Sequence, residues 1–192
     1  YKVIQAGAKV LGNNKDGIDF SLEDDYYGDT RFHIPFIAWY QVMNASLALT
    51  TMEVLKDRIP VTMEQLQAGI ANTRWQGRME TILPGVIVDG AHNEDGVRRF
   101  VETAERFQKE YPLTLLFSAV NDKDYQDMIH TICSRIKFRK VVTTEVGGYR
   151  EVPSAELAEI FCKEGCKDVG NSDNIEEAFH MAHEAKGEDG ML

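Results

Sequence analysis

The sequence predicts an α/β protein whose second part, residues 74–192, is a Rossmann-like domain with a mostly parallel sheet. Two observations support this prediction. First, short apolar runs alternate with amphipathic segments of helical period through this part, and strands that alternate with helices form parallel sheets covered on both faces. Second, the turn Asp89-Gly-Ala-His-Asn93 joins the apolar run Val86–Val88 to an amphipathic segment, and open α/β sheets bind ligands at such strand-to-helix turns.

The elements of this second part follow from the spacing of its apolar residues. Strands are expected over 79–83, 86–89, 113–120, 140–146 and 168–170. Apolar stripes at helical spacing lie between them, within 97–107, 125–136, 157–161 and 175–182. Asp173 and Glu176 are suited to the N-terminal cap of the last helix, and Gly190-Met-Leu192 is expected to begin a further strand.

Residues 1–73 lack this regular alternation, so they are expected to form a different domain. Its expected elements are a strand beginning at Tyr1–Ile4, more strand to residue 22 around a turn at 12–17, a short extended piece after residue 29, a helix over 36–56 with Pro35 in its first turn, and a helix to about 71. Thr62 and Gln65 form the capping box that opens this last helix. Residues 72–74 are the expected linker.

Composition excludes several classes of protein. Hydrophobic residues make up 43% of the chain and charged residues 27%, as in ordinary globular domains. The net charge of −10 argues against non-specific binding to nucleic acid or to an anionic membrane. Apolar runs fall far short of the ~20 residues that a membrane-spanning helix needs. No signal peptide is visible, so the expected location is cytoplasmic.

Neither the cysteines nor the histidines indicate a metal site. Cys133, Cys162 and Cys166 form no disulfide framework and lack the partners of a zinc site. A reduced compartment is therefore expected. His180 and His183 share one helix face without a third ligand, which is typical of a polar surface.

Four motifs together resemble the folylpolyglutamate synthase/dihydrofolate synthase family of the Mur ligase superfamily. They are Trp75-Gln-Gly-Arg-Met-Glu80, Asp89-Gly-Ala-His-Asn93, Tyr40-Gln-Val-Met-Asn44 with Ala45, and Asp122-Lys-Asp124 after an apolar strand. Tyr40 stands where the family usually has His. The resemblance extends over most of the chain from about residue 38, and the upstream Gly-Arg together with the Asp-Gly-Ala-His-Asn turn is its most specific part.

The resemblance implies an ATP site. It assigns Asp89 to the nucleotide, where a carboxylate at a strand end can bind the ribose. It assigns Arg78 to the phosphates, which a guanidinium fork suits, and Asn44 to the adenine, with Gln41 one turn earlier on the same helix face. From the residues alone, Asp89 could also cap a helix, Arg78 could form a surface ion pair, and Asn44 could be solvated.

Three further residues are candidates for the chemistry and for glutamate. His92 could steady a phosphoryl group or the incoming amino acid as a cation or a hydrogen-bond donor. Lys123 and Arg150 could bind the carboxylates of an amino-acid substrate. Each of the three could also be an ordinary surface residue.

One motif is missing. No G-x-x-x-x-G-K-[ST] loop occurs, so the usual phosphate cradle and Mg²⁺ seat are not expected here. The resemblance places them in an N-terminal ATPase domain, of which residues 1–73 would be the end, with 74–192 as the C-terminal domain. The chain is thus expected to be a fragment cut at both ends, with no metal ligands of its own.

The expected function belongs to the full-length parent protein. By resemblance, it uses ATP and Mg²⁺ to add L-glutamate to a folate through an acyl phosphate, and it could also make dihydrofolate. The fragment alone is expected to be inactive. Two alternatives remain, namely a Mur ligase acting on a cell-wall precursor and a non-catalytic nucleotide-binding or docking module.

Overall fold

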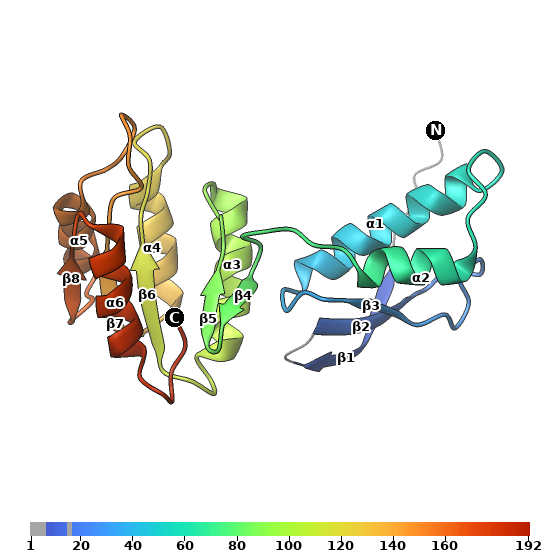
Figure 1. Ribbon diagram of the computed structural model, residues 1–192, viewed down its shortest axis with the longest axis horizontal. Helices are drawn as coiled ribbons and strands as arrows, with labels where there is room; N and C mark the ends of the chain where they lie inside the picture. Colours follow the sequence, from blue (N-terminus) through green and yellow to red (C-terminus); the bar gives the residue numbers. More distant parts are fainter. Residues whose placement is uncertain (1–6, 15–16) are drawn as a thin grey trace. The chain divides into compact units, whose positions relative to one another are not determined.

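The computed structural model describes residues 7–14 and 17–192. The expected strand at Tyr1–Ile4 lies outside the described residues. The chain folds as two compact units, Tyr1–Glu80 and Thr81–Leu192 (Figure 1). The division falls beyond the 72–74 linker because Trp75–Glu80 folds back on itself: the Gly77 amide donates to Glu80 Oε2 at 2.8 Å.

The first unit is a three-stranded antiparallel sheet with two helices. Its strands are β1 (Ala8–Asn14), β2 (Gly17–Leu22) and β3 (Phe32–Ile34), in the order β1-β2-β3, and its helices are α1 (Tyr40–Leu55) and α2 (Met63–Ala71). Alternate residues of β2 are buried, so one face of the sheet meets the helices. Phe20 and Phe32 pack there with ring centroids 5.7 Å apart.

The capping-box prediction is confirmed, but the start of the longer helix is corrected. Thr62 Oγ1 accepts from the Gln65 amide at 3.3 Å, and Gln65 Oε1 accepts from the Thr62 amide at 2.9 Å. Helix α1 begins at Tyr40 rather than Phe36, so Pro35 is not in its first turn. The lead-in segment instead buries the side chains of Phe36 and Ala38 in the core.

The second unit contains the expected parallel sheet. Strands β6 (Leu113–Phe117), β7 (Phe138–Thr143) and β8 (Val169–Asn171) lie in that order, and both pairs are parallel. Strands β4 (Glu80–Leu83) and β5 (Val86–Val88) pair across the turn at Pro84 and Gly85. Gly85 has a φ of 71°, which suits glycine in so short a connection.

Residues 191–192 connect the β4–β5 pair to the three-stranded parallel sheet. They belong to the segment Gly190-Met-Leu192, where the sequence predicts the beginning of a further strand. On one side, the Leu192 amide donates to Gly85 O at 2.9 Å and Leu192 O accepts from the Ile87 amide at 2.7 Å. On the other, Met191 O accepts from the Thr114 amide at 2.8 Å, and Met191 pairs with Leu113 in parallel. The last two residues therefore lie between β5 and β6.

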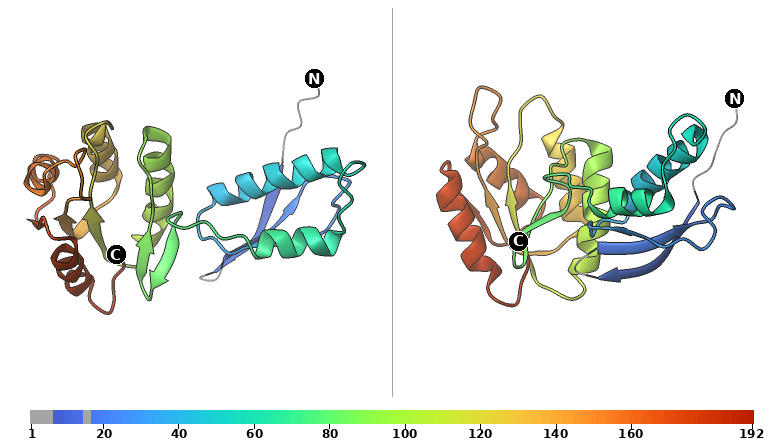
Figure 2. Two further views of the ribbon diagram at one scale, coloured as in Figure 1. Left: turned by 45° about the horizontal axis from the view of Figure 1, so that its top comes forward. Right: turned by 45° about the vertical axis from the view of Figure 1, so that its right-hand side comes forward.

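Helices cover both faces of this sheet, as predicted (Figure 2). They are α3 (Glu94–Phe107), α4 (Tyr125–Arg135), α5 (Ser154–Lys163) and α6 (Ile175–Lys186). Consecutive strand residues point to opposite faces. Val141 of β7 packs with Leu157 of α5, whereas Val142 packs with Ala178 of α6. Helix α6, which connects β8 to residues 191–192, therefore crosses the face of the sheet opposite α5. A right-handed connection back toward β5 requires this face.

Two local predictions in this unit are corrected. Asn174, not Asp173, caps α6, because its Oδ1 accepts from the Glu176 and Glu177 amides. The strand predicted over 113–120 ends at Phe117, and the strand predicted over 140–146 runs from Phe138 to Thr143. Past the end of β6, Val120 pairs with Glu151 in an antiparallel bridge and Ala119 O accepts from the Val152 amide at 3.2 Å. Among the described residues, no helix is both long and apolar enough to span a bilayer.

Candidate functional site

Four of the residues selected from sequence lie in loops at one edge of the second unit. Asp89 and His92 follow β5, Lys123 follows β6, and Arg150 follows β7. These strands are parallel neighbours through residues 191–192, so their carboxyl ends share one edge, the upper one of this unit in Figure 1. This carboxyl edge is the ligand-binding edge of open α/β sheets.

The turn after β5 is held by its own hydrogen bonds. Asp89 Oδ1 accepts from the Ala91 amide at 2.8 Å, and Asn93 Oδ1 accepts from the Gly96 amide at 2.8 Å. Asn93 is therefore the N-cap of α3, which removes the reading of Asp89 as the cap of that helix. His92 Nδ1 lies 2.8 Å from Gly90 O. Because a carbonyl only accepts, Nδ1 is the donor in this contact.

The loops after β6 and β7 are clamped together. Arg150 Nη1 lies 2.9 Å from Asp122 Oδ2 in an ion pair, and Arg150 O accepts from the Asn121 amide at 2.7 Å. Val120 and Glu151 form an antiparallel bridge. These contacts fix the guanidinium of Arg150 at the carboxyl edge. Asp122 belongs to a motif noted in the sequence, but its partner 28 residues away could not be read from spacing.

Beside this clamp, the β7–α5 loop presents Tyr149, whose side chain is 93% exposed. Gly147 and Gly148 precede it with φ values of 78° and 108°, a region that other residues rarely adopt. Tyr125, at the start of α4, donates to Glu156 Oε1 of α5 at 2.7 Å. That hydrogen bond to a carboxylate raises the pKa of Tyr125 and ties together the first turns of two helices that begin at this edge.

A polar cluster centred on the buried Ser154, under the same edge, was not predicted from the sequence. Ser154 is fully buried, and its Oγ donates to Asp173 Oδ1 at 2.5 Å and accepts from Asn171 Nδ2 at 3.2 Å. Thr143 Oγ1 donates to Ser154 O at 2.7 Å. The cluster locks the ends of β7 and β8 to the start of α5. Its members are common residue types at no diagnostic spacing, so no sequence signal could have found them.

Arg78 lies in the folded-back Trp75–Glu80 segment. Its side chain is half-buried, with the guanidinium carbon 5.8 Å from the centroid of the Trp75 ring. Gly77 has a φ of 65° and Met79 a φ of 49°. A positive φ at a residue other than glycine is costly, and it is retained here with the Met79 side chain buried. The segment therefore holds Arg78 in a defined turn.

Asn44 and Gln41 come together on α1 of the first unit. Asn44 Nδ2 donates to Gln41 Oε1 at 2.8 Å, as their spacing of one helical turn allows. Gln41 is 5% exposed, whereas Asn44 is exposed. The Asn44 carbonyl and its second amide hydrogen face away from this bond, so the side chain keeps both a donor and an acceptor.

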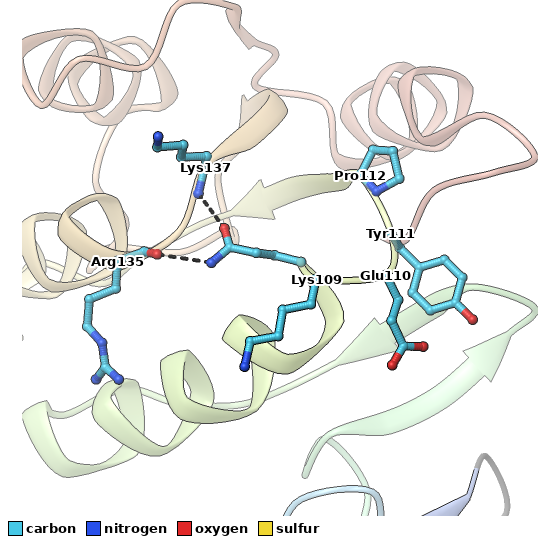
Figure 3. A pocket seen from close by; sticks show the side chains of 7 residues that line it. Lys109, Glu110, Tyr111, Pro112, Arg135 and Lys137 are labelled. Carbon is cyan, nitrogen blue, oxygen red and sulfur yellow. Dashed lines mark hydrogen bonds between the residues drawn. The ribbon is translucent and has the colours of Figure 1, made fainter.

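A pocket of about 640 Å³ lies at the opposite edge, near the amino ends of β6 and β7 (Figure 3). Its lining residues are Gln108, Lys109, Glu110, Tyr111, Pro112, Arg135 and Lys137. Gln108 bridges its wall, donating to Arg135 O at 3.2 Å and accepting from the Lys137 amide at 3.0 Å. Helices α3 and α4 end here, and helix C-termini disfavour anions. Arg135 is already paired with Glu105.

Across residues 7–14 and 17–192, no three His, Cys, Asp or Glu side chains are arranged to hold a metal ion.

Comparison with known proteins identifies the family. Residues 77–192 match the domain described as "Mur ligase, glutamate ligase domain". The chain belongs to the Mur ligase family. Its relatives include the dihydrofolate synthase/folylpolyglutamate synthase of Bacillus subtilis, which is 36% identical over 126 residues. These residues cover 62% of this chain and 29% of that protein. The resemblance to folylpolyglutamate and dihydrofolate synthases is thereby confirmed.

Solved structures agree with this membership. The Mycobacterium tuberculosis folylpolyglutamate synthase, complexed with ADP and AMPPCP, has a TM-score of 0.74 and 25% identity, covering 92% of this chain and 40% of that one. E. coli FolC in complex with ADP has a TM-score of 0.78 over 98% of this chain, with 18% identity, and so supports the fold alone. The Mur ligase chain described here thus spans less than half the length of these relatives.

Proposed function

We propose that this chain provides the glutamate ligase domain of an ATP-dependent enzyme that adds L-glutamate to a folate. The observation that carries the proposal is the Asp89–Asn93 turn, which opens α3 at the carboxyl end of β5 inside the matched domain. The relatives support the substrate class. The Bacillus protein is named a dihydrofolate synthase/folylpolyglutamate synthase, and the Mycobacterium enzyme was solved with ADP and AMPPCP.

The proposed nucleotide contacts come from four residues. Asp89 accepts hydrogen bonds from the ribose hydroxyls, and Arg78 neutralises phosphate oxygens through its planar fork. Asn44, oriented by Gln41, donates to and accepts from the adenine edge. The turn around Arg78 restricts its side chain before the nucleotide binds.

The reaction requires activation of a carboxylate and attack by an amine. We propose that ATP phosphorylates the free carboxylate of the folate, that the glutamate amine attacks the resulting acyl phosphate, and that phosphate leaves. Arg150, held by Asp122, and Lys123 bind the glutamate carboxylates. His92 supports the transferring phosphoryl group or the incoming amine as a hydrogen-bonding group. Mg²⁺, seated outside the described residues, would supply further neutralisation of the phosphates.

A cell-wall acceptor is the second candidate within the same family. A UDP-N-acetylmuramoyl-L-alanyl-D-glutamate–2,6-diaminopimelate ligase from Caldanaerobacter subterraneus is 25% identical over 122 residues. The Bacillus folate enzyme is 36% identical over a similar length. This difference favours the folate substrate.

Substitution of Arg78 in the whole enzyme tests the proposal. Arg78→Ala is expected to lower kcat at least tenfold while changing KM for glutamate little, because its charge is needed most as the phosphoryl group transfers. Arg78→Lys should restore activity only in part, since the fork is lost. The matched control is Arg74→Ala, because the Arg74 guanidinium donates only to nearby backbone carbonyls.

The readout is folate- and glutamate-dependent ADP release. If Arg78→Ala leaves kcat within about twofold of wild type, a change under ~0.5 kcal/mol in the barrier, the phosphate role is wrong. The 192-residue chain by itself is expected not to turn over. Release of ADP by this chain at ~1 s⁻¹ would contradict the proposal that turnover needs parts of the enzyme outside this chain.

A further inference from the structure

Two cysteines far apart in the sequence meet between α4 and α5. The Sγ atoms of Cys133, in α4, and Cys166, after α5, lie 3.6 Å apart. Both side chains are half-buried, whereas Cys162 in the last turn of α5 is exposed. Cys162 lies close enough to Cys166 to influence the ionisation of its thiol. All three cysteines of the chain therefore gather in one region of the second unit.

Packing on a shared core and a sharp turn of the chain bring the two half-buried thiols together. Cys133 and Cys166 pack on a core that contains Ile129 of α4 and Phe161 of α5. Gly165, with a φ of 93°, turns the chain sharply after α5. The Cys166 amide then donates to Phe161 O at 3.1 Å. The chain thus returns Cys166 to the side of α5 that faces α4.

A second contact fastens the same two elements next to the thiols. His130 Nδ1 of α4 lies 2.9 Å from Glu164 Oε2, just past α5. His130 precedes Cys133 by one helical turn, and Glu164 is two residues before Cys166. The packed core, the turn at Gly165 and the contact between His130 and Glu164 therefore all hold the two thiols next to each other.

We propose that Cys133 and Cys166 form a dithiol site that small organic disulfides oxidise to a reversible intramolecular disulfide. The thiolate of Cys166 attacks a sulfur of the small disulfide, which releases one small thiol and leaves a mixed disulfide on Cys166. The thiolate of Cys133 then attacks Cys166 Sγ and expels the second small thiol. In total, two protein thiols are oxidised and one small disulfide is reduced to two thiols, which take up the two protons.

The environment sets the conditions for this reaction. Burial raises the pKa of both the Cys133 and Cys166 thiols. Since the thiolate is the nucleophile, the reduced pair is protected near neutral pH and oxidises faster as the pH rises. In a reducing compartment the pair stays reduced, and an oxidising shift closes it. Closure links residues 133 and 166, so it stabilises the packing of α4 on α5.

Thiol titration and peptide mapping test the proposal without relying on enzyme activity. The reduced chain is incubated under native conditions with oxidised glutathione at pH 8.5, then denatured, alkylated and digested. The expected product is a peptide pair linked through Cys133 and Cys166, with one titratable thiol remaining of the three in the chain. The melting temperature should rise on the order of 10 °C and return after reduction.

Cys162→Ser is the decisive variant because it leaves the proposed pair intact. It should form the same linked peptide and retain no titratable thiol. Cys133→Ser and Cys166→Ser should each abolish the linked peptide, and Cys133→Ala repeats the first test with a substitution suited to an apolar site. A Cys162–Cys166 link, a mixed disulfide confined to Cys162, or a covalent dimer as the main product would overturn the proposal.

Discussion

The two edges of the parallel sheet in the second unit offer a ligand very different surroundings. At the carboxyl edge, helices α3, α4 and α6 begin, capped by Asn93, Asp124 and Asn174. At the amino edge the same helices end, and the pocket of Figure 3 opens there. Helix N-termini favour anions and helix C-termini disfavour them. The pocket and the residues of this unit proposed for ATP and glutamate therefore lie at opposite edges.

The basic residues of the two edges also differ in what they do. At the amino edge, Arg135 makes two hydrogen bonds to the Glu105 carboxylate. Arg139 binds Asp189 through two nitrogens and also donates to Lys186 O at the end of α6. Arg139 thus caps the end of α6, whereas Arg135 links α4 to α3. At the carboxyl edge, Arg150 pairs with Asp122, and its guanidinium carbon lies 5.8 Å from the centroid of the Tyr149 ring on the same loop.

The largest expected effect compares one residue from each edge in the whole enzyme. Asp89→Asn should lower kcat/KM for ATP about 100-fold, because charge-assisted hydrogen bonds are worth about 1.5–3 kcal/mol each. Lys137→Ala, on the pocket wall at the amino edge, should leave the same constant within about twofold, which is under ~0.5 kcal/mol. Steady-state kinetics with varied ATP measures kcat/KM for both variants. Equal losses of kcat/KM in Asp89→Asn and Lys137→Ala would contradict the difference between the two edges.

An intermediate effect is expected for the clamp between the β6 and β7 loops. Arg150→Ala should raise KM for glutamate about tenfold, as the loss of one charged contact predicts. Asp122→Asn should give a smaller increase, because the guanidinium remains but is no longer held. Lys109→Ala is the control at the amino edge. If glutamate KM responds to Lys109 and not to Arg150, the amino acid binds at the other edge.

The smallest effect concerns acid stability at the amino edge. Hydrogen bonds from Arg139 hold the pKa of Asp189 below its ordinary value of 3.8. A lowered carboxyl pKa contributes stability above the unfolded value, and that contribution is lost as pH falls through the folded value. Asp189→Asn should therefore reduce the melting temperature at pH 7 by about 2 °C.

At a pH low enough to protonate the Asp189 carboxylate of the folded wild type as well, the two proteins should melt alike. Thermal unfolding followed by circular dichroism at both pH values measures this difference. ATP and glutamate kinetics at pH 7 should not change in the variant, because the ion pair is at the amino edge. A loss of activity without a loss of stability would count against the separation of the edges.

The sequence predicts the sheet well because its signal is local. Apolar runs and helical stripes locate β6, α4 and β7, and the residues at 190–192 reveal the strand that joins β5 to β6. Strand ends were harder: residues 118–120 are as suited to a strand as the residues before them, but they pair with the loop near Glu151. Asp173 looked like a cap, yet it accepts from Ser154 while Asn174 caps α6.

The candidate site was predictable where the motif itself forms the structure. The Asp89–Asn93 turn closes through bonds between residues two or three apart. The pair between Asp122 and Arg150 and the cluster around Ser154 connect residues brought together only by the tertiary fold. Such contacts depend on which loops meet at a sheet edge, and one sequence does not encode that in any spacing.

Hydrogen–deuterium exchange of the whole enzyme tests the central claim most directly. The enzyme is compared alone and with AMPPCP, Mg²⁺ and L-glutamate. Protection is expected in the carboxyl-edge loops, at residues 89–93, 121–124 and 147–151, with residues 108–112 and 135–137 at the amino edge unchanged. Protection confined to the amino-edge segments, or none in the carboxyl-edge loops, would contradict the assignment of the ligand site to the carboxyl edge.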